Sequence, residues 1–254
     1  MGLLKINDLK VEWGNRVLID SMNLSIKKGE ILAVVGKSGS GKTMTFKATT
    51  GLLASKQFKV SGKIDWNNKV YSPRDMSVFL GKEISYVMQN PMTAFNPVIT
   101  IGSHCRETLT YHLNISKKEA DNIAKKWFEK LRLMEFDRIF SSYCYELSGG
   151  MLQRVMLALA MSVESKIIIA DEPTTALDTI TQKEIVSELK ILNESYGVTI
   201  VFISHDFAVL SQIADNVAVI SGGKLLEYGS TEKILTSPQS KLTKIMLKEL
   251  IDYA

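Results

Sequence analysis

The fold of this chain is decided by the stretch Gly36-Lys37-Ser38-Gly39-Ser40-Gly41-Lys42-Thr43. It follows an apolar run at 31–35 and precedes a stretch at 44–50 that lacks Gly and Pro. This order predicts a strand, a glycine-rich turn and a helix, which is the setting of a phosphate-binding loop. The alternative is a chance match to G-x4-G-K-[ST], which about 1% of chains of this length would contain. The preceding apolar run makes a chance match rarer still.

In such a loop, successive backbone N–H groups turn inward around phosphates, and the helix N-terminus adds free donors and the positive end of its dipole. Lys42 would place its ammonium between the β- and γ-phosphates of ATP, and the Thr43 hydroxyl would ligate Mg²⁺. The residues predicted to bind the nucleotide in this loop are Gly36, Ser38, Gly39, Ser40, Gly41, Lys42 and Thr43.

The bulk properties limit the class of protein. The 254 residues suffice for one large α/β domain, or for one such domain with an inserted subdomain. The net charge of +4 is spread along the chain, and no Lys/Arg block is long enough to predict a nucleic-acid-binding arm. No apolar run approaches the roughly 18 residues that cross a bilayer, and no export signal is visible. If the protein works at a membrane, we expect a peripheral subunit.

The pattern of elements changes along the chain. Residues 3–30 alternate in short β pieces, at 4–6, 9–11 and 23–26, and a second β pair is predicted at 59–71. Residues 103–163 are predicted to be helical. Within them, Ser116 and Glu119 have the spacing of a capping box, and the residues that follow repeat with helical period.

From residue 166 onward, apolar strands alternate with helices, a pattern typical of a parallel sheet that is covered on both faces. The predicted strands are 167–170, 199–203, 217–220 and 224–227, and the predicted helices are 181–195, 206–214 and 240–251.

Two carboxylates, Asp171 and Glu172, follow the predicted strand at 167–170. An Asp at the end of a strand beside the phosphate-binding loop is placed to contact Mg²⁺, so Asp171 reads as a Walker B aspartate. Glu172 could then polarise the attacking water as a general base. An acidic pair at a strand end is otherwise usually a solvated turn. The phosphate-binding loop in the same chain favours the catalytic interpretation.

The stretch Glu146-Leu147-Ser148-Gly149-Gly150-Met151-Leu152-Gln153-Arg154 would by itself be a loop and a helix N-cap. Here it precedes the Walker B strand, and the sequence resembles the ATP-binding cassette (ABC) ATPases, whose signature is LSGGQ followed by a helix. The resemblance implies that Ser148, Gly149 and Gly150 contact the γ-phosphate of an ATP held by a partner subunit. Met151 stands where the family usually has Gln.

Further family motifs follow the same order along the chain. Gln89 matches the Q-loop glutamine that reaches Mg²⁺ or water, and Asp178, in Thr174-Thr175-Ala176-Leu177-Asp178, matches the D-loop between the two sites of a dimer. Thr175 replaces the more common Ser of this motif. His205 matches the switch histidine that contacts the γ-phosphate. Trp13 lies where the family stacks an aromatic ring on adenine, and the alternative for Trp13 is a packed core aromatic.

The resemblance implies an α/β fold: a P-loop NTPase core with a mostly parallel sheet, an N-terminal antiparallel β layer and an inserted α-helical subdomain. We expect a single ABC ATPase domain over 1–254. The core would take approximately 1–90 and 165–235, the helical signature subdomain approximately 91–164, and a C-terminal helical tail approximately 236–254.

The context Met88-Gln89-Asn90-Pro91-Met92-Thr93-Ala94-Phe95-Asn96-Pro97 resembles the dipeptide/oligopeptide/nickel branch of importers. Short length and Met151 are most similar to the nickel-importer ATPases of that branch. The resemblance implies two integral membrane permeases, a second similar ATPase or a second copy of this chain, and an indirectly associated extracytoplasmic binding protein. The expected location is the cytoplasmic face of the cell membrane.

Two alternatives stay open. Within the same branch, the transported substrate could be a dipeptide or oligopeptide rather than nickel or another metal chelate. In a different class, the chain could be a soluble ABC ATPase that acts on nucleic acid or on an assembly. The small net positive charge and the lack of a coiled-coil insert or basic arm disfavour this class, so no nucleic-acid partner is expected.

Overall fold

The computed structural model describes residues 2–53, 57–175 and 177–252. The chain divides into two compact units, and each is considered by itself. The first comprises Met1–Leu80 and Leu192–Ala254, and the second comprises Gly81–Ile191. The boundary near residue 191 falls within the helix α6 (Thr179–Tyr196).

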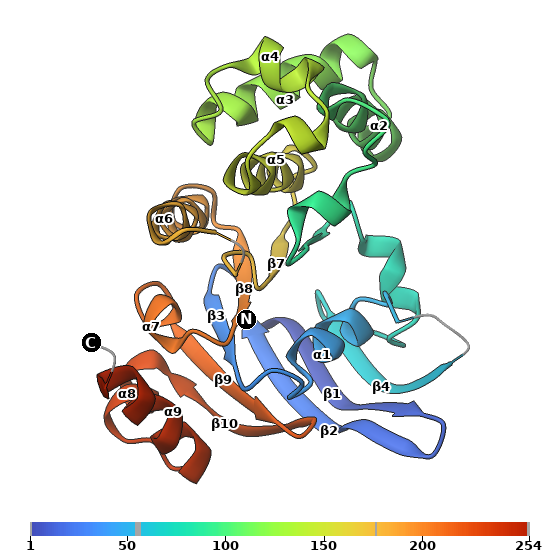
Figure 1. Ribbon diagram of the computed structural model, residues 1–254. Helices are drawn as coiled ribbons and strands as arrows, with labels where there is room; N and C mark the ends of the chain where they lie inside the picture. Colours follow the sequence, from blue (N-terminus) through green and yellow to red (C-terminus); the bar gives the residue numbers. More distant parts are fainter. Residues whose placement is uncertain (1, 54–56, 176, 253–254) are drawn as a thin grey trace. The chain divides into compact units, whose positions relative to one another are not determined.

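The first unit begins with an antiparallel sheet in the order β2-β1-β4-β5 (Figure 1). Its strands are β1 (Gly2–Trp13), β2 (Arg16–Lys27), β4 (Phe58–Trp66) and β5 (Lys69–Tyr71). β1 is one long strand rather than the two short pieces predicted. It continues through a bulge at Asp8, whose φ of 49° is held by a hydrogen bond from its N–H to the Asn23 side chain, 3.0 Å.

The same unit contains strands of a second sheet in the order β10-β9-β3-β8. Its middle strands β3 (Ile31–Val35) and β9 (Asn216–Ser221) run parallel, as do β3 and β8 (Thr199–Ser204). All residues of β3 and β8 are buried, which explains their continuous apolar sequence. The outer strand β10 (Lys224–Ser230) is antiparallel to β9 and alternates between exposed and half-buried residues.

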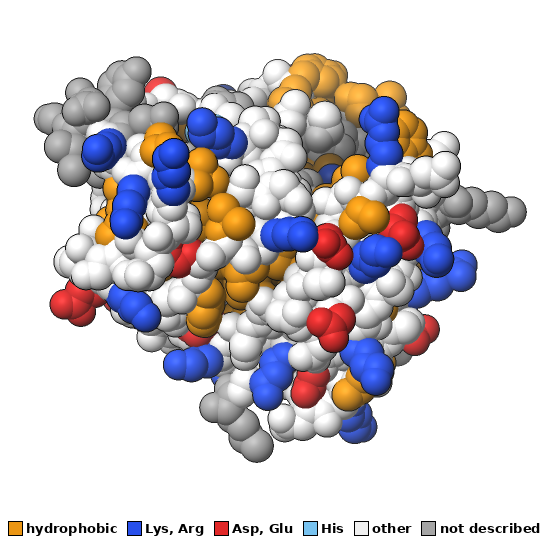
Figure 2. Space-filling model, turned by 90° about the horizontal axis from the view of Figure 1, so that it is seen from below, with side chains coloured by type: hydrophobic (Ala, Val, Ile, Leu, Met, Phe, Trp, Pro, Cys, Tyr) orange, Lys and Arg blue, Asp and Glu red, His pale blue; other side chains and the backbone are white. Residues whose placement is uncertain are grey.

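Short helices complete the first unit. They are α1 (Lys42–Thr49), the 3-10 helix η1 (Asp75–Phe79), α7 (Phe207–Leu210), α8 (Thr231–Thr236) and α9 (Lys241–Asp252). The predicted helix at 206–214 is therefore only four residues long. Figure 2 shows Lys and Arg side chains scattered among acidic and uncharged ones over one face of the molecule, as the sequence predicts for this mildly basic chain.

The second unit contains a parallel pair of strands, β6 (Ile84–Val87) and β7 (Ile167–Asp171), with helices between them in the sequence (Figure 1). The elements between the strands are η2 (Pro91–Ala94), α2 (Ile101–Leu113), α3 (Lys117–Lys130), α4 (Phe136–Ser141), η3 (Cys144–Glu146) and α5 (Gly149–Ser162).

The capping box predicted for the α3 helix is confirmed. The Glu119 carboxylate accepts from the Ser116 N–H at 2.8 Å, and the Ser116 hydroxyl accepts from the Glu119 N–H at 3.3 Å. The core of the helices contains fully buried Phe128, whose ring meets those of Phe136 and Phe140. Trp127, whose spacing belongs to the same helical repeat, is only half-buried, and the Lys130 ammonium lies over its ring.

Candidate functional site

The predicted phosphate-binding loop joins β3 to α1 in the first unit, as its sequence predicts. Lys42 is the first residue of α1 and is buried, with 4% of its surface exposed. Its Nζ donates to the carbonyl oxygens of Gly36 at 2.8 Å and Lys37 at 3.2 Å. The ammonium therefore lies within the curve of the loop, where it can exchange carbonyl partners for phosphate oxygens. The first turn of α1 carries no acidic residue that would repel an anion.

The shape of this loop depends on two glycines that are far apart in sequence. Gly41 caps α1 with a φ of 104°, which residues with a side chain rarely adopt. Gly223, in the turn between β9 and β10, donates its N–H to the Ser40 carbonyl oxygen at 2.9 Å, and its own carbonyl accepts from the Asp20 N–H at 3.0 Å. A Cβ on Gly223 would lie 2.0 Å from the Leu18 carbonyl oxygen. The β9–β10 turn thus stabilises the phosphate-binding loop through its contact with Ser40.

The Ser40 side chain gives a test of whether the loop fits a nucleotide. Ser40 is buried, and among the described residues its hydroxyl oxygen has no hydrogen-bond partner. Buried polar groups are nearly always satisfied in native proteins. A buried hydroxyl without a partner in a loop of this shape fits a phosphate oxygen as its missing partner.

Two more predicted residues lie in the first unit. His205 follows β8 directly, and β8 pairs in parallel with β3 so that Ser204 is opposite Val35. The phosphate loop and His205 therefore leave neighbouring strands at the same edge. Trp13 ends β1 and is 50% exposed, so the alternative of a packed core aromatic is wrong.

The remaining predicted residues lie in the second unit, where the structure brings the two acidic residues against β6 and the Q-loop. Asp171 is the last residue of β7 and is 4% exposed. Its Oδ2 accepts a hydrogen bond of 2.7 Å from the Tyr86 hydroxyl on β6. Burial and the neighbouring carboxylate raise the pKa of Tyr86, so its hydroxyl stays a donor at neutral pH. No motif in the sequence predicts a role for Tyr86.

Glu172 is held by one side chain from its own loop and one from the loop that follows β6. Its Oε2 accepts from the Gln89 amide at 2.8 Å and from the Thr175 hydroxyl at 3.0 Å. Its backbone has a φ of 46°, an uncommon value for a residue with a side chain. Strained backbone of this kind clusters at functional sites. The structure thus joins Gln89 to Glu172 and adds Thr175, whose hydroxyl the sequence did not single out.

The predicted signature residues begin α5. Ser148 is its N-cap, and the hydroxyl accepts from the Met151 N–H at 3.3 Å. A Cβ on Gly150 would lie 2.5 Å from the Thr181 side chain on α6, so the residue must stay small for α5 to approach α6. The N–H groups of the first turn of α5 are the donors that an anion could use.

Asp178 of the predicted D-loop has a local role that the sequence did not reveal. It caps α6, because Oδ1 accepts from the N–H groups of Ile180 and Thr181, at 3.1 and 3.0 Å, and Oδ2 accepts from the Thr181 hydroxyl at 2.6 Å. The hydroxyl hydrogen bond is the main cause of the lowered pKa of Asp178. Ala176 of the same motif lies outside the described residues.

α5 is also tied to α6 by an ion pair. The Arg154 guanidinium donates to Glu188 at 2.8 Å and to Glu184 at 2.6 Å. Glu188 is almost fully buried, and burial raises its pKa despite the guanidinium beside it. Arg154 lies at the end of the signature stretch, and no pattern in the sequence predicts its ion pairs with α6.

The oxygen donors of the second unit suit Mg²⁺. The Asp171 carboxylate and the Gln89 amide oxygen are hard oxygen ligands of the kind that this ion prefers, and the Thr43 hydroxyl of the first unit, considered by itself, is a ligand of the same kind. Within the part of the chain that is described, no group of three or more His, Cys, Asp or Glu side chains could hold a metal. Mg²⁺ is commonly bound by one or two carboxylates together with substrate phosphates, so these residues fit an ion that arrives with a nucleotide.

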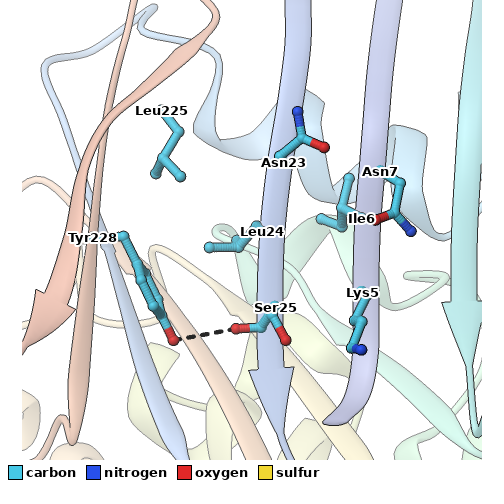
Figure 3. A pocket seen from close by; sticks show the side chains of 8 residues that line it. All are labelled: Lys5, Ile6, Asn7, Asn23, Leu24, Ser25, Leu225 and Tyr228. Atoms are coloured by element: carbon cyan, nitrogen blue, oxygen red, sulfur yellow. Dashed lines mark hydrogen bonds between the residues drawn. The ribbon is translucent and has the colours of Figure 1, made fainter.

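A cavity of about 300 Å³ opens between β1, β2 and β10 in the first unit (Figure 3). Its lining includes Leu24, Leu225 and Tyr228, and the Tyr228 hydroxyl donates to the Ser25 carbonyl oxygen at 3.2 Å. None of the predicted site residues lines it. The cavity is therefore distinct from the nucleotide-binding loop.

The ABC transporter family model matches residues 19–175, which include the phosphate loop, Gln89, the signature and both carboxylates. The chain belongs to the ABC transporter family. Its fold agrees, because a dimeric structure of the ATP-binding cassette MJ0796 bound to ADP and Pi matches with a TM-score of 0.77 and 26% identity, covering 90% of this chain and 98% of that one. As a member of this family with these motifs, the chain is an ATP hydrolase.

Similar proteins extend over nearly the whole ABC chain. The metal-staphylopine import system ATP-binding protein CntD of Staphylococcus aureus is 39% identical over 252 residues, covering 97% of this chain and 93% of that protein. The oligopeptide transport ATP-binding protein AmiE of Streptococcus pneumoniae is 36% identical over 256 residues, covering 98% of this chain and 72% of that protein. Among the described residues, no helix has the length and apolar character needed to span a membrane.

Proposed function

We propose that this chain is the ATP-hydrolysing subunit of a membrane importer for a metal or metal chelate, with nickel as the first candidate ion. The observation that carries the proposal is the 39% identity to a metal-staphylopine import ATPase over 97% of the chain. This chain would handle the energy source, while the transported metal would be bound by the permeases and the binding protein.

Separate roles in nucleotide binding are proposed for the residues of each unit. In the first unit, the loop Gly36–Thr43 would wrap the phosphates, Lys42 would neutralise the β- and γ-phosphates, and Trp13 would stack on adenine. The Thr43 hydroxyl and, from the second unit, Asp171 and Gln89 would hold Mg²⁺, which would draw charge from the transferred phosphoryl group.

Glu172 is proposed as the general base. Its carboxylate would take a proton from the attacking water as the bond to the γ-phosphorus forms and the bond to the leaving ADP oxygen breaks. Gln89, which donates to Glu172, would orient that water, and His205 would contact the γ-phosphate.

The signature residues are proposed to serve a different nucleotide. Ser148, Gly149 and Gly150 would present the N-terminus of α5 to the γ-phosphate of an ATP bound by a partner ATPase. Asp178 would lie between the sites of that dimer. The partner would be a similar but distinct subunit or a second copy of this chain.

The permease-facing surface is proposed to be the loop after β6 together with the helices that follow it. Met88, Met92 and Val98 are 39%, 41% and 74% exposed there, so this loop offers apolar side chains that a partner protein could cover. We propose the division expected from the sequence as the functional one: a core of about 1–90 and 165–235, a signature subdomain of about 91–164, and a tail of about 236–254. Two permeases would hold the protein at the cytoplasmic face of the cell membrane.

The second candidate is import of oligopeptides, favoured by the 36% identity to an oligopeptide transport protein over 98% of this chain. The deciding experiment is uptake in vesicles that contain this ATPase with its co-purifying permeases and binding protein. Uptake of ⁶³Ni, free or chelated, should require ATP and should fall to background in the Glu172→Gln variant. ATP-dependent uptake of labelled dipeptides without ⁶³Ni would overturn the metal proposal in favour of the peptide one.

The soluble alternative is tested separately by membrane fractionation. The importer proposal expects this chain in the membrane fraction together with hydrophobic subunits. Recovery only from the soluble fraction, with ATP hydrolysis stimulated by DNA, would contradict it.

A further inference from the structure

The Tyr86 hydroxyl donates to Asp171 at 2.7 Å, the shortest of the hydrogen bonds described above to the Asp171 and Glu172 carboxylates. Asp171 is buried and Tyr86 is half-buried, so the bond is shielded from competing water. Hydrogen bonds of this kind, with an ionised acceptor and little solvent, are stronger and more directional than neutral exposed ones.

The strand register explains why this tyrosine reaches that aspartate. β6 and β7 are parallel, and Tyr86 lies opposite Ile169. Asp171 comes two residues after Ile169 and therefore projects from the same face of the strand. The diagonal between Tyr86 and Asp171 is too long for a small side chain but within reach of an aromatic one that ends in a donor.

We propose that Tyr86 is a positioning residue for Mg²⁺, which acts by fixing the rotation of the Asp171 carboxylate. The inference rests on the proposed role of Asp171 as a metal ligand. With Oδ2 held by the tyrosine, the carboxylate plane is set by β6 before nucleotide and metal arrive, and the second oxygen has a defined direction. The cost of ordering the ligand is then met during folding rather than during metal binding.

The expected loss of Mg²⁺ affinity can be estimated from the behaviour of other metal sites. Removal of a group that hydrogen-bonds a metal ligand commonly lowers metal affinity or activity by about 10- to 100-fold. Tyr86→Phe keeps the ring and its packing and removes only the donor. Because the metal is bound together with ATP, the loss should appear as a smaller gain in ATP affinity on adding Mg²⁺, by thermodynamic linkage.

The experiment measures the Kd for ATP twice in the full-length protein, once in EDTA and once with saturating Mg²⁺. Tyr86→Phe should leave the Kd in EDTA unchanged and reduce the Mg²⁺-dependent gain in affinity by about tenfold. The Mn²⁺ form, followed by electron paramagnetic resonance, should show weaker ion retention in the same variant. The matched control is Tyr228→Phe, which removes a tyrosine hydroxyl bonded to the Ser25 carbonyl oxygen and should change neither Kd.

Two further variants separate the possible failures. Asp171→Asn should reduce the Mg²⁺-dependent gain more than Tyr86→Phe does, and adding Tyr86→Phe to it should cause no further loss. If Asp171→Asn leaves the gain intact, the proposed metal ligand is wrong. If Asp171→Asn reduces it and Tyr86→Phe only lowers the thermal midpoint in both media, Tyr86 has a structural function alone and the inference is overturned.

Discussion

The Gln89 side-chain amide donates a hydrogen bond to the Glu172 carboxylate, with 2.8 Å between Nε2 and Oε2. Gln89 begins the loop that leads into the helices of the second unit, and Glu172 follows β7. The proposed general base is therefore tied directly to the segment proposed to contact the permeases. A shift of that loop would change the direction of the Glu172 carboxylate without any intermediary.

Replacement of Glu172 by Gln should separate binding from hydrolysis. The amide cannot accept the proton of the attacking water, so the hydrolysis rate should fall by about 10²- to 10⁴-fold. ATP affinity should be retained, because the phosphate loop belongs to different elements. ATP should then trap a dimer, detectable by size-exclusion chromatography. Turnover at the normal rate would contradict the assignment of Glu172 as the base.

Thr175 should matter through its hydroxyl alone. Thr175→Val removes the donor to Glu172 and keeps the shape, and the loss of an exposed hydrogen bond worth about 1 kcal/mol predicts roughly a fivefold lower kcat. Thr175→Ser keeps the donor and serves as the control, with kcat near that of the wild type. Equal kcat values for the Val and Ser variants would show that the hydrogen bond does not position Glu172.

The Lys42 ammonium should carry much of the phosphate affinity. Lys42→Ala removes a charged donor worth about 1.5–3 kcal/mol, which predicts a Kd for ATP raised by roughly 10- to 100-fold. Fluorescence titration with a labelled ATP analogue measures this directly. Lys47→Ala, in the last turn of the same helix, removes an equal charge and should leave the Kd within about twofold. Similar losses in the two variants would point to net charge rather than to a specific contact.

Arg154 should contribute to stability through the charge it neutralises. Arg154→Met leaves the buried Glu188 carboxylate without its guanidinium and should cost about 3–5 kcal/mol of unfolding free energy, measured by urea denaturation. The double variant with Glu188→Leu should recover most of this loss, because the uncompensated charge is then gone as well. A double variant no more stable than the single one would assign the loss to packing of the Arg154 side chain.

The docking of α9 should depend on pH through Glu227. Burial opposes ionisation of this carboxylate, but hydrogen bonds from the Gln239 and Ser240 N–H groups and the Thr243 hydroxyl outweigh it and lower its pKa. A lowered folded-state pKa means that the stabilisation is complete above the ordinary value of 4.5 and is lost as the pH falls below it.

Hydrogen exchange of residues 241–248, taken relative to the intrinsic exchange rate at each pH, should therefore accelerate below about pH 4.5 in the wild type. In Glu227→Gln it should be faster already at neutral pH, by roughly fivefold for a loss of about 1 kcal/mol. Exchange that is equally slow in the variant at neutral pH would mean that other contacts hold α9.

The sequence was sufficient for features that depend on local pattern. The loop at Gly36–Thr43, the cap at Ser116 and the buried runs of β3 and β8 each follow from residues within a few positions of one another. The order of the motifs along the chain was also sufficient to predict the family, because the phosphate-binding loop, the Q-loop, the signature, the Walker B strand and the D-loop follow one another as they do in ABC ATPases.

Features that depend on register or on distant contacts could not be predicted in this way. Tyr86 reaches Asp171 only because β6 and β7 pair with a particular offset, and no spacing in the sequence encodes that offset. The exposure of Trp13 and the length of β1 likewise depend on cross-strand contacts, including the one that lets Asp8 form a bulge. The ion pair of Arg154 could not be predicted either, because it depends on the packing of α6 against α5, and the sequence alone does not distinguish Arg154 from an exposed surface charge.

The turn at Gly222 and Gly223 is, in appearance, a convenient site for protein engineering: a short, polar hairpin end far from every sequence motif. Such turns are where tags, inserted domains and new termini are usually accepted. Here the same turn packs against the phosphate-binding loop. The Gly223 N–H donates to the Ser40 carbonyl oxygen, and there is no room for a side chain at Gly223. We expect that a reporter inserted at this position would leave the protein folded but unable to bind ATP. A random-mutagenesis screen should likewise recover Gly223 among the positions essential for ATP binding.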